Sequence, residues 1–275
     1  MTFSVNTNAS ALSALQNLNK TAVRLENTQT AINTGMKVAS SKDNGAVFAI
    51  AQSLRADVSG IKAATSSIDR ALSTIEVAIA AGEAVSDLLI EMKEKAVAAK
   101  DTGLDTASRT SLNNDFKQLR DQISSIVTNA EFNGTNVVKN GGSDIVAITN
   151  DTGSNTITVG AQDLSLAGTV VALSAGSSIS TQDLASTSVA NIESSIQNVN
   201  ASLSALGAGA RRLDLQKTFI SQLQDTIEVG IGNLVDADMA KASADLQSLQ
   251  VKQQLGLQAL SIANQAPQSV LGLFQ

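Results

Sequence analysis

The sequence contains no cysteine, histidine, tryptophan or tyrosine, and it has a single proline. Without cysteine and histidine there can be no disulfide, thiolate nucleophile or imidazole base, and the usual zinc ligands are missing. The carboxylates show no paired arrangement suited to acid–base catalysis, and Asp236 and Asp238 are expected to serve a turn and a helix cap rather than a cation. The sequence therefore predicts neither an enzyme nor a bound cofactor or metal.

Positive charge and long apolar runs are also scarce. The 19 Lys and Arg residues are outnumbered by 25 Asp and Glu, which gives a net charge of -6, and Arg211 with Arg212 is the one basic pair that stands out. Such a surface disfavours nucleic acid as a partner. No stretch approaches the roughly 20 apolar residues of a membrane span, and the N-terminus lacks the features of a signal peptide. We expect a soluble chain, or one that leaves the cell without a cleaved signal.

Aromatic residues make up only 2% of a chain that is 43% hydrophobic. A core built from Leu, Ile, Val and Ala suits thin seams between helices better than the thick interior of a globular enzyme. Apolar or small residues recur at heptad spacing in two segments, Leu54–Ala99 and Val189–Leu234, the second interrupted only by Lys217 and Gln224. These patterns predict two long antiparallel helices that form a coiled-coil rod.

Amphipathic helices are predicted at both ends of the chain. The first spans residues 4–34, with Asn6, Thr7 or Asn8 as its cap, and the last follows residues 236–238 and is limited by Pro267. The first carries few ion pairs and would be marginal alone in water, while the last has two apolar stripes that need neighbours on two sides. We expect the following side chains to be buried against other chains: Leu12, Leu15, Leu18, Ala22, Leu25, Ile32, Leu246, Leu249, Leu255, Leu260, Ile262, Leu271 and Phe274.

The middle of the chain has a different composition. A shorter helix is expected around residues 112–126, and turn sequences then separate two β-branched runs, residues 144–149 and 156–159, which predicts a β-hairpin. Residues 160–185 are rich in Ser, Ala, Thr and Gly, and we expect them to form an exposed, weakly ordered cap. This section is too small for a domain with a large core of its own.

Several segments resemble the bacterial flagellin family, and together they cover nearly the whole chain. NTNASALSALQNL near the start is similar to the opening motif of that family, residues 30–55 to the turn between its first two helices, and AEFNGTNVV to the entrance of its β-hairpin. LGAGARRLD and residues 233–274 resemble its returning helix and terminal segment. Their order along the chain makes a chance match very unusual.

The resemblance implies a structural subunit that polymerises into the flagellar filament for swimming motility. It further implies export of the unfolded chain through the flagellar type III apparatus and an extracellular location in the filament. The implied partners are other flagellin subunits, hook-associated and cap proteins, and an export chaperone. A hook-filament junction protein and an adhesin rod are the alternatives, whereas the metallopeptidase motif that a few flagellins carry requires histidines that this chain lacks.

The implied fold is mainly α, with an antiparallel helical rod, a small β-hairpin and termini that pair as an inner coiled coil. We expect a terminal domain of residues 1–40 with 236–275, a helical domain of residues 41–130 with 184–235, and a surface region of residues 131–183. Some flagellins carry O-linked sugars, so hydroxyl side chains of the surface region are candidate sites: Ser143, Thr149, Thr152, Ser154, Ser177 and Thr181.

Overall fold

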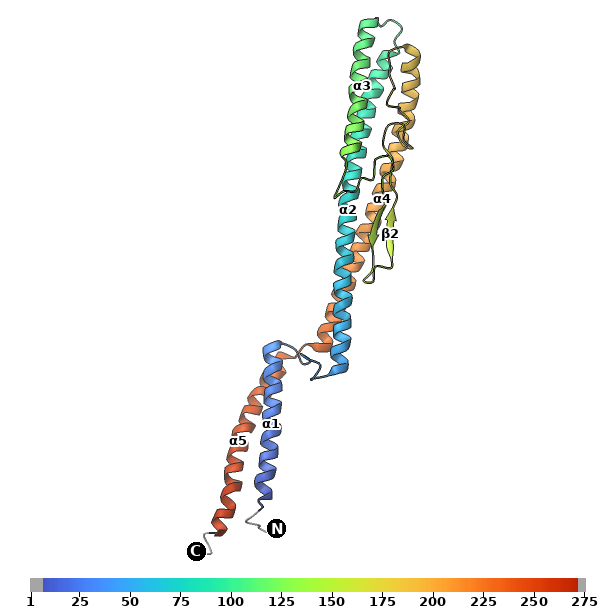
Figure 1. The fold of residues 1–275 in the computed structure, drawn as a ribbon. Coiled ribbons are helices and arrows are strands. Elements are labelled where there is room, and N and C mark those ends of the chain that lie inside the picture. The colour runs from blue at the N-terminus through green and yellow to red at the C-terminus, as the bar shows by residue number, and fades with distance from the viewer. Residues whose placement is uncertain (1–6, 272–275) are drawn as a thin grey trace. The chain divides into compact units, whose positions relative to one another are not determined.

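A computed structural model of the chain describes residues 7–271, and side chains up to residue 265. The fold is mainly helical with one small antiparallel sheet, as predicted (Figure 1). Its elements, in chain order, are α1 (Ala9–Thr34), α2 (Gly45–Ala99), α3 (Thr106–Asn129), β1 (Ile145–Ile148), β2 (Thr156–Val159), α4 (Gln182–Val235) and α5 (Met239–Leu271). The chain divides into a central unit, residues 57–225, and a terminal unit that contains the residues on both sides of it.

In the central unit, α2 and α4 are antiparallel neighbours. Lys93 Nζ lies 2.9 Å from Glu193 Oε1, and Lys217 Nζ lies 2.7 Å from Asp69 Oδ1. The two ion pairs are 24 residues apart on each helix, from 69 to 93 on α2 and from 193 to 217 on α4. The two helices therefore keep one register over this length, as two equally spaced heptad patterns predict.

The predicted seam between these helices is buried. On α4, every seventh residue has at most 2% of its surface exposed: Ile192, Val199, Leu206, Leu213 and Ile220. The alternate positions of the heptad, such as Ile196 and Leu203, are half-buried. On α2, Ile68, Ile75 and Leu89 are fully buried. The thin apolar seam expected from a composition poor in aromatics is thus confirmed.

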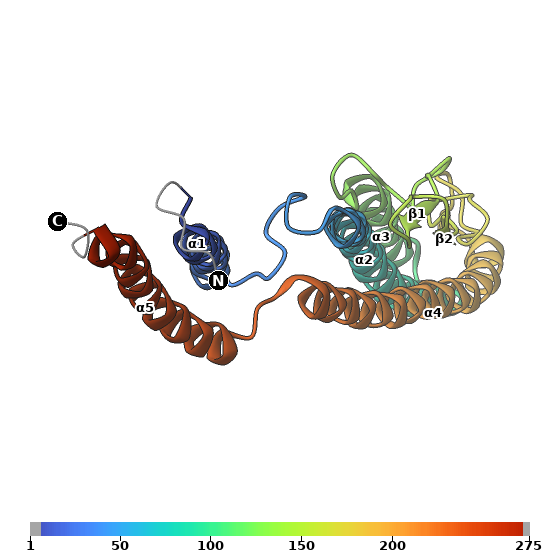
Figure 2. The ribbon, with the colours of Figure 1, turned by 90° about the horizontal axis from the view of Figure 1, so that it is seen from below.

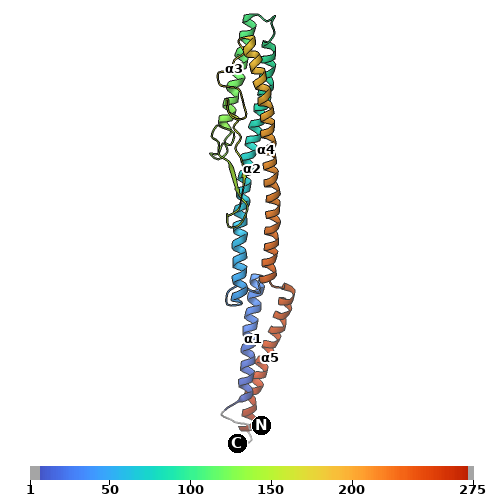
Figure 3. The same cartoon turned by 90° about the vertical axis from the view of Figure 1, so that its right-hand side faces the viewer.

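The third helix of the central unit, α3, turns back along α2 after a short connection (Figures 1 and 3). Arg109 on α3 donates to the carbonyl oxygens of Ala99 and Asp101, so it satisfies backbone acceptors at the C-terminal end of α2. The carboxylate of Asp105 accepts a 2.6 Å hydrogen bond from the Ser108 amide and caps α3. That backbone hydrogen bond lowers the pKa of Asp105.

The predicted β-hairpin forms, but the segment that follows it is not an exposed cap. Strands β1 and β2 pair with Ile145 opposite Val159, within the two predicted β-branched runs. Beyond them, five large apolar side chains are 7% exposed or less: Leu164, Val170, Val171, Leu173 and Ile179. The expectation of exposure is wrong for these residues, because the segment packs its sparse apolar side chains inward in the central unit.

A second column of residues on α4 explains how this irregular segment is held. Ser188, Ser195, Ser202 and Gly209 recur at intervals of seven, and the three serines are at most 5% exposed. The hydroxyl of Ser195 accepts a 2.9 Å hydrogen bond from the amide of Ala172. A Cβ on Gly209 would lie only 2.8 Å from the methyl groups of Val159. Small side chains thus let strand and loop backbone approach the helix closely.

A similar column of small residues on α2 contacts the hairpin. The hydroxyl of Ser67, which is 7% exposed, accepts a 3.1 Å hydrogen bond from the amide of Ile148 in β1. Seven residues earlier, a Cβ on Gly60 would lie 2.5 Å from the carbonyl oxygen of Asp151 in the hairpin turn. Seen along the helices in Figure 2, α3 and the hairpin lie beside α2 and α4. The apolar seam and the small-residue columns therefore occupy neighbouring faces of the same helices.

In the terminal unit, α1 and α5 run side by side (Figures 1 and 3). The connections that lead out of α1 and into α5 pair with each other: the Lys37 amide donates to the Val235 carbonyl at 2.7 Å, and the Ala237 amide to the Gly35 carbonyl at 2.8 Å. Val38, Ala51 and Val235 form a small buried cluster beside this pairing. Two segments about 200 residues apart are thereby fixed together.

The helix α5 does not end at Pro267, contrary to our expectation, but continues to Leu271. Because proline has no N–H, the carbonyl of Ala263, four residues earlier, loses its donor within the helix. The side-chain amide of Asn8 supplies one instead, with Nδ2 donating to the Ala263 oxygen at 2.7 Å. Its Oδ1 accepts from the Ala11 amide at 3.1 Å, which makes Asn8 the N-cap of α1.

Candidate assembly surface

The pair of α1 and α5 buries very little of its apolar surface. No described residue of α1 is buried, and on α5 Leu249, at 9% exposure, is the most enclosed of the large apolar residues whose side chains are described. Two helices that pack only against each other can each cover one narrow stripe, and the rest of their apolar surface stays in water. This arrangement differs from that of α2 and α4, whose seam is enclosed.

The structure separates the predicted interface residues into two groups. One group is at least half-buried within the terminal unit: Leu18, Leu25, Ile32, Leu246, Leu249 and Leu260. The other is exposed: Leu12, Leu15, Ala22, Leu255 and Ile262. The side chains of Leu271 and Phe274 lie outside the described residues. Leu18 of the first group contacts α5 directly, since its Cδ1 lies 3.2 Å from a Cβ built on Gly256.

Some exposed apolar side chains of α1 and α5, such as Val23 and Leu257, are absent from the sequence prediction. Val23 on α1 is 57% exposed and Leu257 on α5 is 54% exposed. Both lie off the main apolar stripes, so periodicity alone did not select them. A count of the apolar residues around the whole circumference of each helix would have indicated them. One partner helix covers only a narrow stripe, so apolar residues outside that stripe must stay exposed.

A shallow groove of about 290 Å³ lies between α1 and α5. Arg24, Asn27 and Thr28 line it from α1, and Asp245, Ser248, Leu249 and Lys252 line it from α5. Leu249 is the one apolar residue of a polar lining that carries both charge signs. The groove therefore offers a neighbouring chain mainly charged and hydrogen-bonding groups, because Leu249 is only 9% exposed.

The energetic consequence follows from the exposed area. Fully burying a Leu, Ile or Val side chain contributes about 1.5–3 kcal/mol, so covering a half-exposed one contributes on the order of 1 kcal/mol. Besides Val23 and Leu257, the side chains of Leu12, Val251, Leu255 and Ile262 are each more than half exposed. Contacts with further chains can stabilise this helix pair by several kcal/mol, which two helices in water do not obtain from each other.

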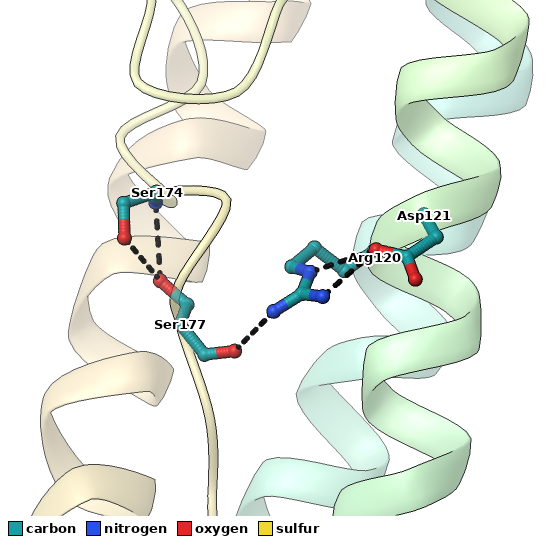
Figure 4. A network of polar contacts seen from close by, with 4 residues as sticks. All are labelled: Arg120, Asp121, Ser174 and Ser177. Carbon is teal, nitrogen blue, oxygen red and sulfur yellow. Dashed lines mark hydrogen bonds and ion pairs between the residues drawn. The ribbon is translucent and has the colours of Figure 1, made fainter.

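The candidate modification sites differ in accessibility. Ser143, Thr152, Ser154 and Thr181 are exposed, whereas Thr149 and Ser177 are half-buried. Figure 4 shows that the Ser177 hydroxyl accepts from the Ser174 amide at 3.0 Å, while Arg120 Nη1 donates to the Ser177 carbonyl at 3.0 Å. Arg120 also pairs with Asp121, so it links α3 to this loop. Ser177 is therefore the least suitable of the six for a bulky substituent.

A mainly helical chain with an enclosed central unit and a terminal helix pair that leaves its apolar faces open defines a class of structural proteins that assemble with further chains. The comparisons with known proteins name the family. Residues 5–141 match the bacterial flagellin N-terminal helical region, and residues 189–274 match the bacterial flagellin C-terminal helical region. The chain belongs to the bacterial flagellin family.

Relatives support this assignment over the full length. The chain is 48% identical over 272 residues to flagellin FljK of Caulobacter vibrioides, covering 99% of this chain and 98% of the relative. It is 35% identical to a flagellin of Brucella melitensis, covering 99% of each. A putative flagellar hook-associated protein from Vibrio parahaemolyticus shares the fold, with a TM-score of 0.59 and 16% identity over 70% of this chain and 100% of that one.

Relatives of this similarity show that the chain is a structural subunit of the flagellar filament, as the sequence predicted. Between the two regions that match the family, the chain has little more than the hairpin and the packed loop. Among the described helices, none has both the length and the hydropathy that a bilayer span requires.

Proposed function

We propose that α1 and α5 are the part of the subunit that forms the filament contacts, and that they become fully ordered only as neighbouring subunits pack against them. The supporting observation is the exposure of their apolar side chains, with Leu249 the most enclosed of those described. The mechanism is folding coupled to polymerisation, in which intermolecular burial offsets the entropy lost when the helices order. We place the terminal domain at residues 1–40 with 236–275.

The substitution Leu249→Asp tests this proposal. A carboxylate at the centre of the groove cannot be buried without a large desolvation penalty, so we expect no filaments by electron microscopy and a polymerisation threshold raised at least 10-fold. The far-UV circular dichroism of the central helices should be unchanged. Gln118→Asp on the exposed face of α3 is the matched control and should polymerise normally. Normal filaments from Leu249→Asp would show that this surface is not the interface.

The exposed group of residues extends the test beyond the pairing of α1 with α5. Leu15→Asp and Ile262→Asp change side chains that are 43% and 68% exposed, so neither disrupts packing inside the described chain. If the faces contact neighbouring subunits, each variant should still raise the polymerisation threshold. If only Leu249→Asp has an effect, the damage is internal to the helix pair.

We further propose that the chain leaves the cell unfolded through the flagellar type III apparatus, with an export chaperone shielding its terminal helices, and that cap and hook-associated proteins meet it at the filament. The absence of cysteine suits passage into an oxidising exterior. Detection of the chain in the medium of a strain that lacks the filament cap, and its loss when the export apparatus is inactivated, are the expected results.

A hook-filament junction protein is the alternative, because one neighbour by fold is a putative hook-associated protein. At 16% identity that likeness concerns the fold, whereas flagellin FljK matches at 48%. Concentrated purified chain should give long regular filaments; discrete oligomers under all precipitating conditions would favour the junction protein. Intact mass of the secreted chain tests glycosylation, for which the exposed Ser143, Thr152, Ser154 and Thr181 are the candidate sites.

A further inference from the structure

The outer face of α2 in the central unit carries a stripe of acidic and apolar residues. Ile90 and Val97 are 55% and 51% exposed. They alternate with exposed carboxylates at steps of three, four or seven residues, so all lie on one side of the helix. We define the acidic stripe as Glu76, Glu83, Asp87, Ile90, Glu94 and Val97. None of its four carboxylates forms an ion pair with another described residue.

A second stripe on α4 has the opposite charge. Leu215 and Phe219 are 73% and 58% exposed, and they follow directly after Arg211 and Arg212, which are also exposed. Neither arginine is ion-paired within the described part of the chain. We define these four residues as the basic stripe. Large exposed apolar side chains next to unpaired charge are typical of a protein–protein interface.

We propose that the acidic stripe of one subunit binds the basic stripe of a second copy of this chain in the filament. The proposal rests on the filament function above and adds a contact outside the terminal helices. Each stripe offers two large apolar side chains that can pack on one another, and the arginines lie close to Glu94 across the contact. Complementary charge sets which faces meet and in which register.

The positions of the stripes define how the two copies are related. The basic stripe lies at the level of the ion pair between Lys217 and Asp69, and the acidic stripe at the level of the pair between Lys93 and Glu193. These levels are 24 residues apart along α2, which is about 36 Å at about 1.5 Å per residue. Parallel copies would therefore be offset by about 36 Å along their helices.

This contact uses two different surfaces, so each bound copy keeps one free stripe and the pair still presents one stripe of each kind. A heterologous contact of this kind repeats and produces an open helical assembly, whereas a contact that used the same surface twice would close after two copies. The proposed contact therefore propagates in the manner that a filament requires.

The absence of cysteine allows a direct geometric test in the full-length chain. Phe219→Cys and Ile90→Cys, which face each other at this offset, are made in separate chains, copolymerised and oxidised, so that any disulfide joins two copies. We expect covalent dimers in the mixed filaments and few in filaments of either variant alone. Val146→Cys, at a 55% exposed site on β1 outside both stripes, replaces Phe219→Cys as the control and should give no dimers with Ile90→Cys.

Charge reversal supplies an independent measurement. Arg212→Glu and Glu94→Arg should each raise the polymerisation threshold about 10-fold, and the double variant should restore it, whereas Lys117→Glu on α3 should have no effect. Normal filaments without cross-linking would overturn the stripe contact and leave the filament function intact. Efficient cross-linking in unpolymerised protein would also overturn it, because it would indicate a closed antiparallel dimer. Failure of the unmodified chain to polymerise would instead contradict the filament function itself.

Discussion

The hydrogen bond from Asn8 to the carbonyl of Ala263 makes a quantitative prediction about the terminal helices. Asn8 caps α1 through Oδ1 and donates through Nδ2 to the carbonyl that Pro267 leaves without a helical donor. Asn8→Ser keeps a good N-cap but removes the amide donor. The expected cost is the value of one neutral hydrogen bond, about 1 kcal/mol, because the carbonyl is left unpaired in a partly buried site.

The same substitution in a Pro267→Ala background isolates that bond. Alanine at position 267 restores an N–H that can donate to Ala263 within the helix, so Asn8→Ser should then cost much less. The difference between the two backgrounds, a double-mutant coupling of about 1 kcal/mol, is the signature of the proposed link. Asn8→Ala removes the cap as well and should cost about 2 kcal/mol with proline present.

The polymerisation threshold of the purified chain is the appropriate measurement, because the terminal helices contribute their free energy on assembly. A cost of about 1 kcal/mol corresponds to a roughly fivefold higher threshold. Additive effects of Asn8→Ser and Pro267→Ala, within about 0.3 kcal/mol, would refute the argument that Asn8 replaces the missing proline donor.

Three further predictions concern α2, α3 and α4. Ser195→Ala should destabilise the chain by about 1–3 kcal/mol, because the Ala172 amide loses its acceptor beside a fully buried position, while Ser194→Ala on the exposed face should change little; urea denaturation compares them. Gly60→Ala should lower the melting temperature, because its Cβ meets the Asp151 carbonyl, and Gly230→Ala, with open space around it, should raise it. The pKa of Asp105 in the folded protein is lowered below 3.8, so its cap stabilises α3 above pH 3.8. This stabilisation is lost as the pH falls through the lowered pKa, and the melting temperature should fall with it. An equally steep fall for Asp105→Asn, which has no carboxylate to titrate, would contradict this.

Local patterns were sufficient for the elements themselves. Heptad spacing predicted the seam from Ile192 to Ile220, because each buried residue recurs at a fixed interval within one helix. Turn sequences predicted β1 and β2 for the same reason. The six hydroxyl candidates and the interface residues of α1 and α5 were selected by composition and periodicity, which do not report how much surface a partner covers.

The long-range contacts could not be found in this way. Serines such as Ser195 appear as ordinary polar helix residues until a loop 23 residues away brings an amide to them. The helix break expected at Pro267 did not occur, because a donor 255 residues from Ala263 replaces the missing hydrogen bond. Both effects depend on which distant segments meet.

The amino-acid sequence by itself determined that this protein is built from long amphipathic helices with a small hairpin, since periodicity and turn chemistry act over a few residues. Only the tertiary structure decided which small residues pack against the hairpin and which apolar side chains of α1 and α5 stay exposed. It also decided that exposed charged stripes of opposite sign lie on α2 and α4. The physical reason is that burial and hydrogen-bond satisfaction belong to pairs of segments, and the partner of each is set by the folded chain.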